Sequence, residues 1–203
     1  MRQLKTGSNM KQDIILSGVG GQGILSIATV IGWAALEENL HLKQAEVHGM
    51  SQRGGDVQSH LRLSDAPIHS DLIPLGGADI IISMEPMEAL RYLPFLAQDG
   101  WIITNTVPLK NISNYPEMEE VEKALAKVKN LVALDAEAMA KAVQSPRSAN
   151  MVLLGASAAV MKILEPEKLR DGIRRIFARK GDAIVDANLK AFDAGLEFSR
   201  KQK

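Results

Sequence analysis

The sequence predicts an α/β domain with a mostly parallel β-sheet and helices on both faces. Two observations predict this class. Over the first two thirds of the chain, short apolar segments alternate with longer ones of helical pattern, as strands alternate with crossover helices. The glycine-rich hexapeptide GVGGQG, residues 18–23, also stands between the first strand segment and the first helix segment. Together these features make the predicted arrangement Rossmann-like, with a helical C-terminal part.

The N-terminal part contains the first expected strand, at residues 13–17, and a helix at residues 22–37. This helix is apolar nearly all round, so we expect it to be deeply packed. Residues 42–50 and 57–65 follow as strands separated by a short polar turn. That spacing predicts an antiparallel strand pair near 42–65, which is unusual in a doubly wound sheet. Apolar and polar side chains alternate in 57–65, so one face of this strand is expected to be wet or interfacial.

The middle and C-terminal parts continue the alternation. The continuous apolar run ADIIISM, residues 78–84, is typical of a central parallel strand. The elements expected after it are a helix at 85–96, a strand at 101–106, a helix at 117–128, a strand at 131–136, and helices at 137–143, 148–163, 166–179 and 182–200. We find no internal repeat and no linker. Residues 10–203 are therefore predicted to form one domain, with residues 1–9 as a disordered extension.

Composition excludes several classes of function. Lys plus Arg and Asp plus Glu each number 24, so no broad field attracts nucleic acid or an anionic membrane. No apolar run approaches the roughly 20 residues that span a bilayer, and the first residues lack the apolar core of a signal peptide. We therefore expect a cytoplasmic protein. The sequence contains no cysteine, which excludes disulfides, a cysteine nucleophile and thiolate-bound iron–sulfur clusters on this chain.

The glycine loop is the first candidate site. Gly18, Gly20 and Gly23 match GxGxxG, and Gly21 adds a fourth glycine. Glycine there allows positive φ and close approach of the backbone to a phosphate at the helix N-terminus. A full dinucleotide fingerprint also needs an acidic residue at the end of the second strand, and Glu46 stands near that place without a helix following it. Either the loop binds an anionic group, such as a phosphate of a larger cofactor, or the glycines only allow tight helix packing.

The segment HGMSQRGG, residues 48–55, is the second candidate. Arg53 offers a planar fork suited to carboxylate or phosphate, and we favour an interface or ligand loop over a solvated turn. The four histidines lack metal-ligand spacing, and no GxSxG or P-loop motif is present, so we predict no metal site and no catalytic residue. Glu85 is expected to supply charge at a helix start, and Asn150 to be a buried hydrogen-bond anchor.

Several ordered motifs together resemble the gamma subunit or gamma domain of the 2-oxoacid:ferredoxin oxidoreductases. Within that family the chain is most similar to the beta subunit of the indolepyruvate enzymes. The motifs are GVGGQG, EVHGMSQRGGDVQSHLR, IPLGGADIIISMEPMEALRYLPFL, the pair NT, PRSANMVLLGA and NLKAFDAG, which together cover nearly the whole chain. HGMSQRGG is the most specific of them. QSPRSAN departs from the pattern, because a Gly-Asn pair is expected ahead of its arginine.

The resemblance implies one subunit of an enzyme that oxidatively decarboxylates a 2-oxoacid, here an aryl pyruvate such as indolepyruvate, with coenzyme A. The products would be an acyl-CoA, carbon dioxide and reduced ferredoxin. A large partner subunit would hold thiamine diphosphate and iron–sulfur clusters, while this chain would be inactive alone and would meet ferredoxin only indirectly. The resemblance also implies coenzyme A at the subunit interface, and the residues where we expect it are Gly18, Gly20, Gly21, Gly23 and Arg53. Isolated, the chain would pair with itself through its partner-facing surface.

Two alternatives stay open at the level of sequence. The chain could be a self-sufficient NAD(P)- or FAD-dependent oxidoreductase, which the missing helix after Glu46 disfavours. It could also be a non-enzymatic scaffold that uses the same fold. A thermal-shift titration with NAD, NADP and FAD would test the first alternative, and co-purification of a large, cysteine-rich, brown partner would distinguish the oxidoreductase subunit from the second.

Overall fold

The structure is a computed structural model that describes residues 10–48, 55–110 and 112–202. Within these residues a six-stranded sheet forms the centre, in the order β2-β3-β1-β4-β5-β6. The strands are β1 (Lys11–Val19), β2 (His41–His48), β3 (Asp56–Ser64), β4 (Ala78–Ser83), β5 (Leu96–Asn105) and β6 (Leu131–Leu134). Strands β1, β4, β5 and β6 are parallel, whereas β3 is antiparallel to both β2 and β1. The predicted mostly parallel sheet with an antiparallel pair is confirmed. The expected extension, residues 1–9, lies outside the described residues.

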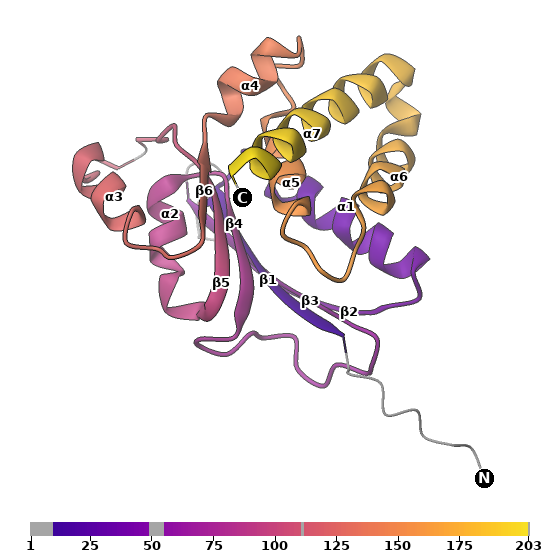
Figure 1. The fold of residues 1–203 in the computed structure, drawn as a ribbon, viewed down its shortest axis with the longest axis horizontal. Coiled ribbons are helices and arrows are strands. Elements are labelled where there is room, and N and C mark those ends of the chain that lie inside the picture. Colours follow the sequence, from indigo (N-terminus) through magenta and orange to yellow (C-terminus); the bar gives the residue numbers. More distant parts are fainter. Residues whose placement is uncertain (1–9, 49–54, 111, 203) are drawn as a thin grey trace.

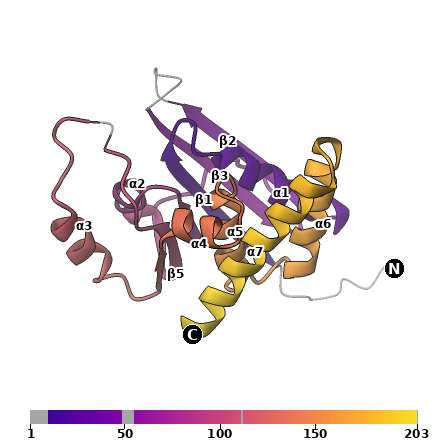
Figure 2. The same ribbon diagram turned by 90° about the horizontal axis from the view of Figure 1, so that it is seen from above.

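Helices cover both faces of the sheet (Figures 1 and 2). They are α1 (Ile24–Glu37), α2 (Pro86–Arg91), η1 (Leu93–Phe95), α3 (Met118–Leu125), α4 (Ala136–Ala142), α5 (Ala149–Ala158), α6 (Pro166–Phe177), η2 (Ala178–Lys180) and α7 (Asp182–Gln202). One face carries α1, α5, α6 and α7, and the other carries α2 and α3. In the described ranges, no helix is long and apolar enough to cross a membrane.

Two hydrophobic cores follow from the alternation of side chains along the strands. On β1, Ile14 and Leu16 belong to the core under α1 and α5, whereas Ile15 belongs to the core under α2 and α3. Each of these three side chains has no exposed surface. A central parallel strand covered on both faces is expected to be apolar on both faces, which explains the continuous apolar runs.

The chain after α2 differs from the predicted single helix over 85–96. It leaves α2 at Tyr92, forms η1, and enters β5 at Leu96 rather than at residue 101. Pro94 lies in this stretch, and a proline lacks the N–H that would continue a helix. The pairing of β5 with β4 is irregular between Ala78 and Ile80, so Asp99 and Gly100 lie in a distorted part of β5.

The polar face of β3 is another departure from expectation. His60 is only 6% exposed and the Arg62 side chain only 13% exposed. The loop over residues 65–77 folds back on this face, and the main-chain N–H of Ile73 donates a hydrogen bond of 2.9 Å to His60 Nδ1. Of the two expectations for this face, wet or interfacial, the wet one was wrong, because an irregular loop, which has no periodic pattern, covers the face.

Candidate functional site: a cavity beside the glycine loop

The glycine loop links the end of β1 to the start of α1. Gly21 and Gly23 have φ values of +101° and +83°, and Gly23 is the N-cap of α1. These are left-handed conformations that L side chains rarely adopt, so the backbone itself requires glycine there. Gly20 is not among the residues with positive φ; its N–H donates to the Gly55 carbonyl at 2.9 Å. That bond fixes the glycine loop against the chain entering β3.

The side chain of Gln22 closes the crevice between the carboxyl ends of β1 and β4. Its Oε1 accepts from the Val19 N–H at 2.7 Å, and its Nε2 donates to the Met84 carbonyl at 3.2 Å. A Cβ added at Gly18 would lie 2.7 Å from Ile24 Cδ1 and 2.9 Å from Gln22 Oε1, so a larger residue there would require these two side chains to move. Dinucleotides bind in the crevice where the chain switches from one face of the sheet to the other. Here a ligand in that crevice would have to displace Gln22.

Glu46 does not complete a dinucleotide fingerprint. In that fingerprint the acidic residue ends the strand next to the first one, where it can reach a ribose. Glu46 lies on β2, and β3 runs between β2 and β1. Because neighbouring strands are about 4.8 Å apart, the carboxylate is carried about 10 Å away from the first strand. This strand order disfavours the reading of the chain as a self-sufficient nicotinamide enzyme.

A cavity of about 590 Å³ lies beside the glycine loop, and we call it the glycine-loop cavity. Three segments far apart in the sequence form its walls: the glycine loop with the start of α1, the connection from α4 to α5, and the stretch from the end of α6 into α7. Its lining residues are Gly21, Gln22, Gly23, Ser26, Gln144, Ser145, Pro146, Arg147, Ser148, Ala149, Asn150, Phe177, Lys180, Ile184, Ala187 and Asn188. Its volume is in the range typical of small-molecule sites.

The glycine-loop cavity is suited to an anion. Helices α1 and α5 both begin at its wall, and the N–H groups of a helical first turn have no acceptor within the helix. Arg147 and Lys180 add two cations, and none of the described lining residues is acidic. The Lys180 ammonium lies 5.3 Å from the centre of the Phe177 ring, so an apolar surface adjoins the charge. This combination fits a phosphate group attached to an apolar or aromatic body.

Asn150 holds the two helix starts together. Its Nδ2 donates to the Gly23 carbonyl at 3.1 Å, across 127 residues of sequence. A Cβ at Gly23 would lie 2.7 Å from the same Nδ2, so the glycine permits this approach. The structure thus confirms Asn150 as a hydrogen-bond anchor, although the residue is half-buried at the cavity wall and not fully buried. Ser148 occupies the N-cap of α5, but its Oγ pairs with Ser145 Oγ at 2.6 Å instead of capping the helix.

The predicted site residues are only partly brought together. Gly21 and Gly23 line the glycine-loop cavity, whereas Gly18 and Gly20 shape the loop behind it. Arg53 lies outside the described residues. Arg147 and Asn188 lie in the family motifs PRSANMVLLGA and NLKAFDAG, but sequence reasoning did not join these residues, or Lys180, to the glycine loop. Their place in those motifs was the available signal for Arg147 and Asn188.

Glu85 lies at the carboxyl edge of the sheet without solvent exposure. Its Oε2 accepts from the Glu88 main-chain N–H at 2.8 Å, so it caps α2, and its Oε1 accepts from the Tyr115 hydroxyl. Burial, together with this carboxylate, raises the pKa of Tyr115 above its usual value. These contacts confirm the helix-start role expected for Glu85 and show that it also fixes the loop that carries Tyr115.

Over the part of the chain that the structure describes, no three His, Cys, Asp or Glu side chains are grouped to hold a metal ion. The thiolates that an iron–sulfur cluster needs are not in this chain, because the sequence contains no cysteine.

Comparisons with known proteins agree with one another. The family model described as pyruvate ferredoxin/flavodoxin oxidoreductase matches residues 13–198. "Indolepyruvate oxidoreductase subunit IorB" of Pyrococcus horikoshii is 37% identical, over 93% of this chain and 96% of that protein. The keto/oxoacid ferredoxin oxidoreductase gamma subunit of Geobacter sulfurreducens has a similar fold, with a TM-score of 0.70, 21% identity, and coverage of 95% and 98% of the two chains.

A third relative is longer than this chain. The 2-oxoglutarate:ferredoxin oxidoreductase of Magnetococcus marinus, solved with 2-oxoglutarate, coenzyme A and succinyl-CoA bound, gives a TM-score of 0.73 at 22% identity. The match covers 94% of this chain but only 31% of that polypeptide. From the family match over most of its length and the identity to IorB, this chain belongs to the pyruvate ferredoxin/flavodoxin oxidoreductase family.

Proposed function

We propose that this chain is the small subunit, without redox cofactors of its own, of a cytoplasmic 2-oxoacid:ferredoxin oxidoreductase acting on an aryl pyruvate such as indolepyruvate. The 37% identity to an indolepyruvate oxidoreductase subunit, over nearly the full length of both chains, supports this substrate class. In the proposed reaction, the 2-oxoacid and coenzyme A react with two oxidised ferredoxins. The products are an acyl-CoA, carbon dioxide, one proton and two reduced ferredoxins.

The redox work belongs to a large partner subunit in this proposal. That subunit holds thiamine diphosphate, which stabilises the carbanion left by decarboxylation, and iron–sulfur clusters, which pass the two electrons on to ferredoxin. The absence of cysteine from this chain supports that division. This chain therefore meets ferredoxin only indirectly and does not turn over alone.

The glycine-loop cavity gives this chain its own role, which is to hold the phosphate-bearing part of coenzyme A. One observation carries this assignment: the starts of α1 and α5, Arg147 and Lys180 converge on a single cavity. Phosphates fit helix N-termini and a guanidinium fork, and the Phe177 ring offers a surface to an adenine or to the pantetheine arm. Arg53 is a further candidate for the same phosphates. The volume of about 590 Å³ suits part of the cofactor, leaving the thiol arm to reach the partner subunit.

Co-purification tests this proposed function. The tagged chain is isolated from its native cells, and the accompanying proteins are identified and assayed for iron, acid-labile sulfide and thiamine diphosphate. We expect a large, brown, cysteine-rich partner and a reduction of viologen dye that requires both an aryl pyruvate and coenzyme A. A stable pair that reduces the dye with 2-oxoglutarate but not with any aryl pyruvate would overturn the substrate assignment. A chain recovered alone would overturn the subunit assignment.

A further inference from the structure

Exposed leucines gather at the amino edge of the sheet, opposite the glycine-loop cavity. Leu72 and Leu75 in the loop before β4 are 58% and 71% exposed, and Leu93 in η1 is 39% exposed. The Gly76 N–H donates to the Pro94 carbonyl at 3.0 Å, which brings the loop beside η1. We call these three leucines, with the groove described next, the amino-edge surface.

An apolar groove of about 340 Å³ adjoins these leucines and shares Leu93 with them. It runs between the start of β5 and the end of α3. Its lining residues are Leu93, Leu96, Gln98, Gly100, Ala124, Lys127, Val128 and Lys129. The charged groups in this lining are the two lysines; Lys129 is paired with Asp99 at 2.7 Å, so Lys127 is the cation that this inference uses. An apolar side chain followed by a carboxylate would match the groove in both shape and charge.

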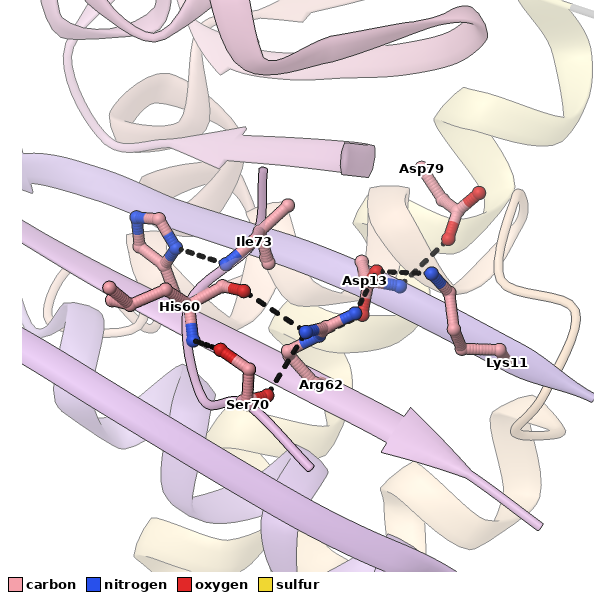
Figure 3. Close-up of polar contacts among 8 residues, drawn as sticks. Lys11, Asp13, His60, Arg62, Ser70, Ile73 and Asp79 are labelled. Atoms are coloured by element: carbon pink, nitrogen blue, oxygen red, sulfur yellow. Dashed lines mark hydrogen bonds and ion pairs between the residues drawn. The ribbon is translucent and has the colours of Figure 1, made fainter. Parts of the chain in front are cut away.

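The loop carrying Leu72 and Leu75 is fixed by a buried ionic network (Figure 3). Arg62 forms a two-pronged pair with the fully buried Asp13, at 2.8 and 3.0 Å. The Arg62 Nη1 also donates to the carbonyls of Ser70 and Leu72, both at 3.0 Å. Together with the bond from the Ile73 N–H to His60, these contacts hold the loop in one conformation against β3.

This arrangement is costly for a loop without a partner. A buried ion pair contributes little net stability, because desolvation offsets the attraction between the charges. Exposed leucines contribute nothing to the folded state, and neighbouring exposed apolar groups mark interaction surfaces. A fixed backbone, however, lowers the entropy that docking would otherwise cost. The network is therefore best explained as holding Leu72 and Leu75 in fixed positions for docking.

From this we infer that the amino-edge surface docks the large partner subunit, through a segment in which apolar side chains stand next to acidic ones. The inference rests on the proposed function for the existence of that subunit. In the M. marinus enzyme, the matching fold forms 31% of a longer polypeptide, so there the fold lies within the same chain as the rest of that protein. This amino-edge contact is additional to a contact with the large subunit beside the glycine-loop cavity, at the carboxyl edge, from which the thiol arm of coenzyme A has to reach that subunit.

Binding measurements between the two purified subunits test the surface. The double variant Leu72→Ser/Leu75→Ser is compared with Leu36→Ser, a matched control because Leu36 is 62% exposed at the end of α1. We expect the double variant to bind the large subunit about 10-fold or more weakly, and the control to bind like wild type. Lys127→Glu should also weaken binding, and increasingly so at low salt. Melting temperatures of all variants are measured in parallel, and we expect them to match wild type.

The outcomes separate this inference from the proposed function. Wild-type affinity in both the double variant and Lys127→Glu overturns the docking surface while the subunit assignment stands. A change in the self-association of the isolated chain, with unchanged affinity for the large subunit, also overturns it, because the surface then serves a second copy. If the wild-type chain binds no large subunit, the proposed function itself falls.

Discussion

The contact between α5 and α7 offers a sharp test of the packing. Gly155 on α5 and Gly195 on α7 lie where the two helix backbones touch. A Cβ at Gly155 would be 1.9 Å from the carbonyl oxygen of Phe192, and a Cβ at Gly195 would be 1.9 Å from that of Val152. Real Cβ atoms essentially never come within 3.0 Å of such atoms, so Gly155→Ala must push the helices apart by about 1 Å.

The magnitude follows from two opposing effects. Replacing glycine by alanine inside a helix normally gains about 1 kcal/mol. Overpacking a core normally costs about 1–3 kcal/mol, and here the clash is with backbone, which cannot rotate away, so we expect a gross cost of about 4 kcal/mol. The net loss of about 3 kcal/mol corresponds to a fall in Tm of about 6–12 °C for a chain of this size.

Calorimetry or thermal circular dichroism on Gly155→Ala checks this expectation. Gly32→Ala is the matched control, because Gly32 is buried on α1 and an added Cβ there would meet only Leu42 Cδ2, at 3.4 Å. The control should melt at or slightly above the wild-type temperature. If Gly155→Ala melts within about 2 °C of wild type, the reasoning from helix contact is refuted.

Three other predictions concern charged groups. Arg147→Ala should raise the KM for coenzyme A about 10-fold in the complex while kcat stays near wild type, as expected for the loss of one charge-assisted hydrogen bond. Lys123→Ala, which removes an exposed side chain of α3, should change neither constant. Burial, with the nearby Arg62 charge, lowers the pKa of His60 in the folded protein. The free energy of unfolding is therefore highest above the pKa that histidine has in the unfolded chain, about 6.5, and it falls as the pH drops below that value. Urea unfolding at pH 7.5 and 5.5 should show this loss in wild type and less of it in His60→Asn, which keeps an acceptor for the Ile73 N–H; equal losses would contradict the assignment. Asp13→Asn should cost about 3 kcal/mol of unfolding free energy by leaving Arg62 buried without a carboxylate, and Asp13→Asn/Arg62→Met should recover much of it; a cost below about 1 kcal/mol would show that the pair is dispensable.

The periodic spacing of apolar residues in the sequence was enough to predict most of the fold. The apolar runs around Ile15 and Ile81 predicted central strands, and both residues are fully buried in the core under α2 and α3. The short polar turn after residues 42–50 predicted an antiparallel pair, and β2 and β3 form one. These features could be predicted because burial of a regular element imposes a repeat on the sequence.

Irregular and long-range features could not be predicted in this way. The loop at residues 65–77 has no repeat, so its cover over His60 and Arg62 was missed. The antiparallel pairing of β3 with β1 depends on strand order, which local sequence does not encode. The glycine motif predicted one wall of the glycine-loop cavity. Arg147 and Lys180 line the other walls only because α5 and α7 pack beside that loop.

Reconstitution from separately purified subunits tests the central claim most directly. The rate of aryl-pyruvate-dependent, coenzyme-A-dependent dye reduction is measured for this chain, for the large subunit, and for the mixed pair. If the redox cofactors belong to the large subunit, the pair turns over and this chain alone does not, with or without added NAD. Turnover of the 2-oxoacid by this 22.0 kDa chain with a nicotinamide cofactor and no second protein would contradict it.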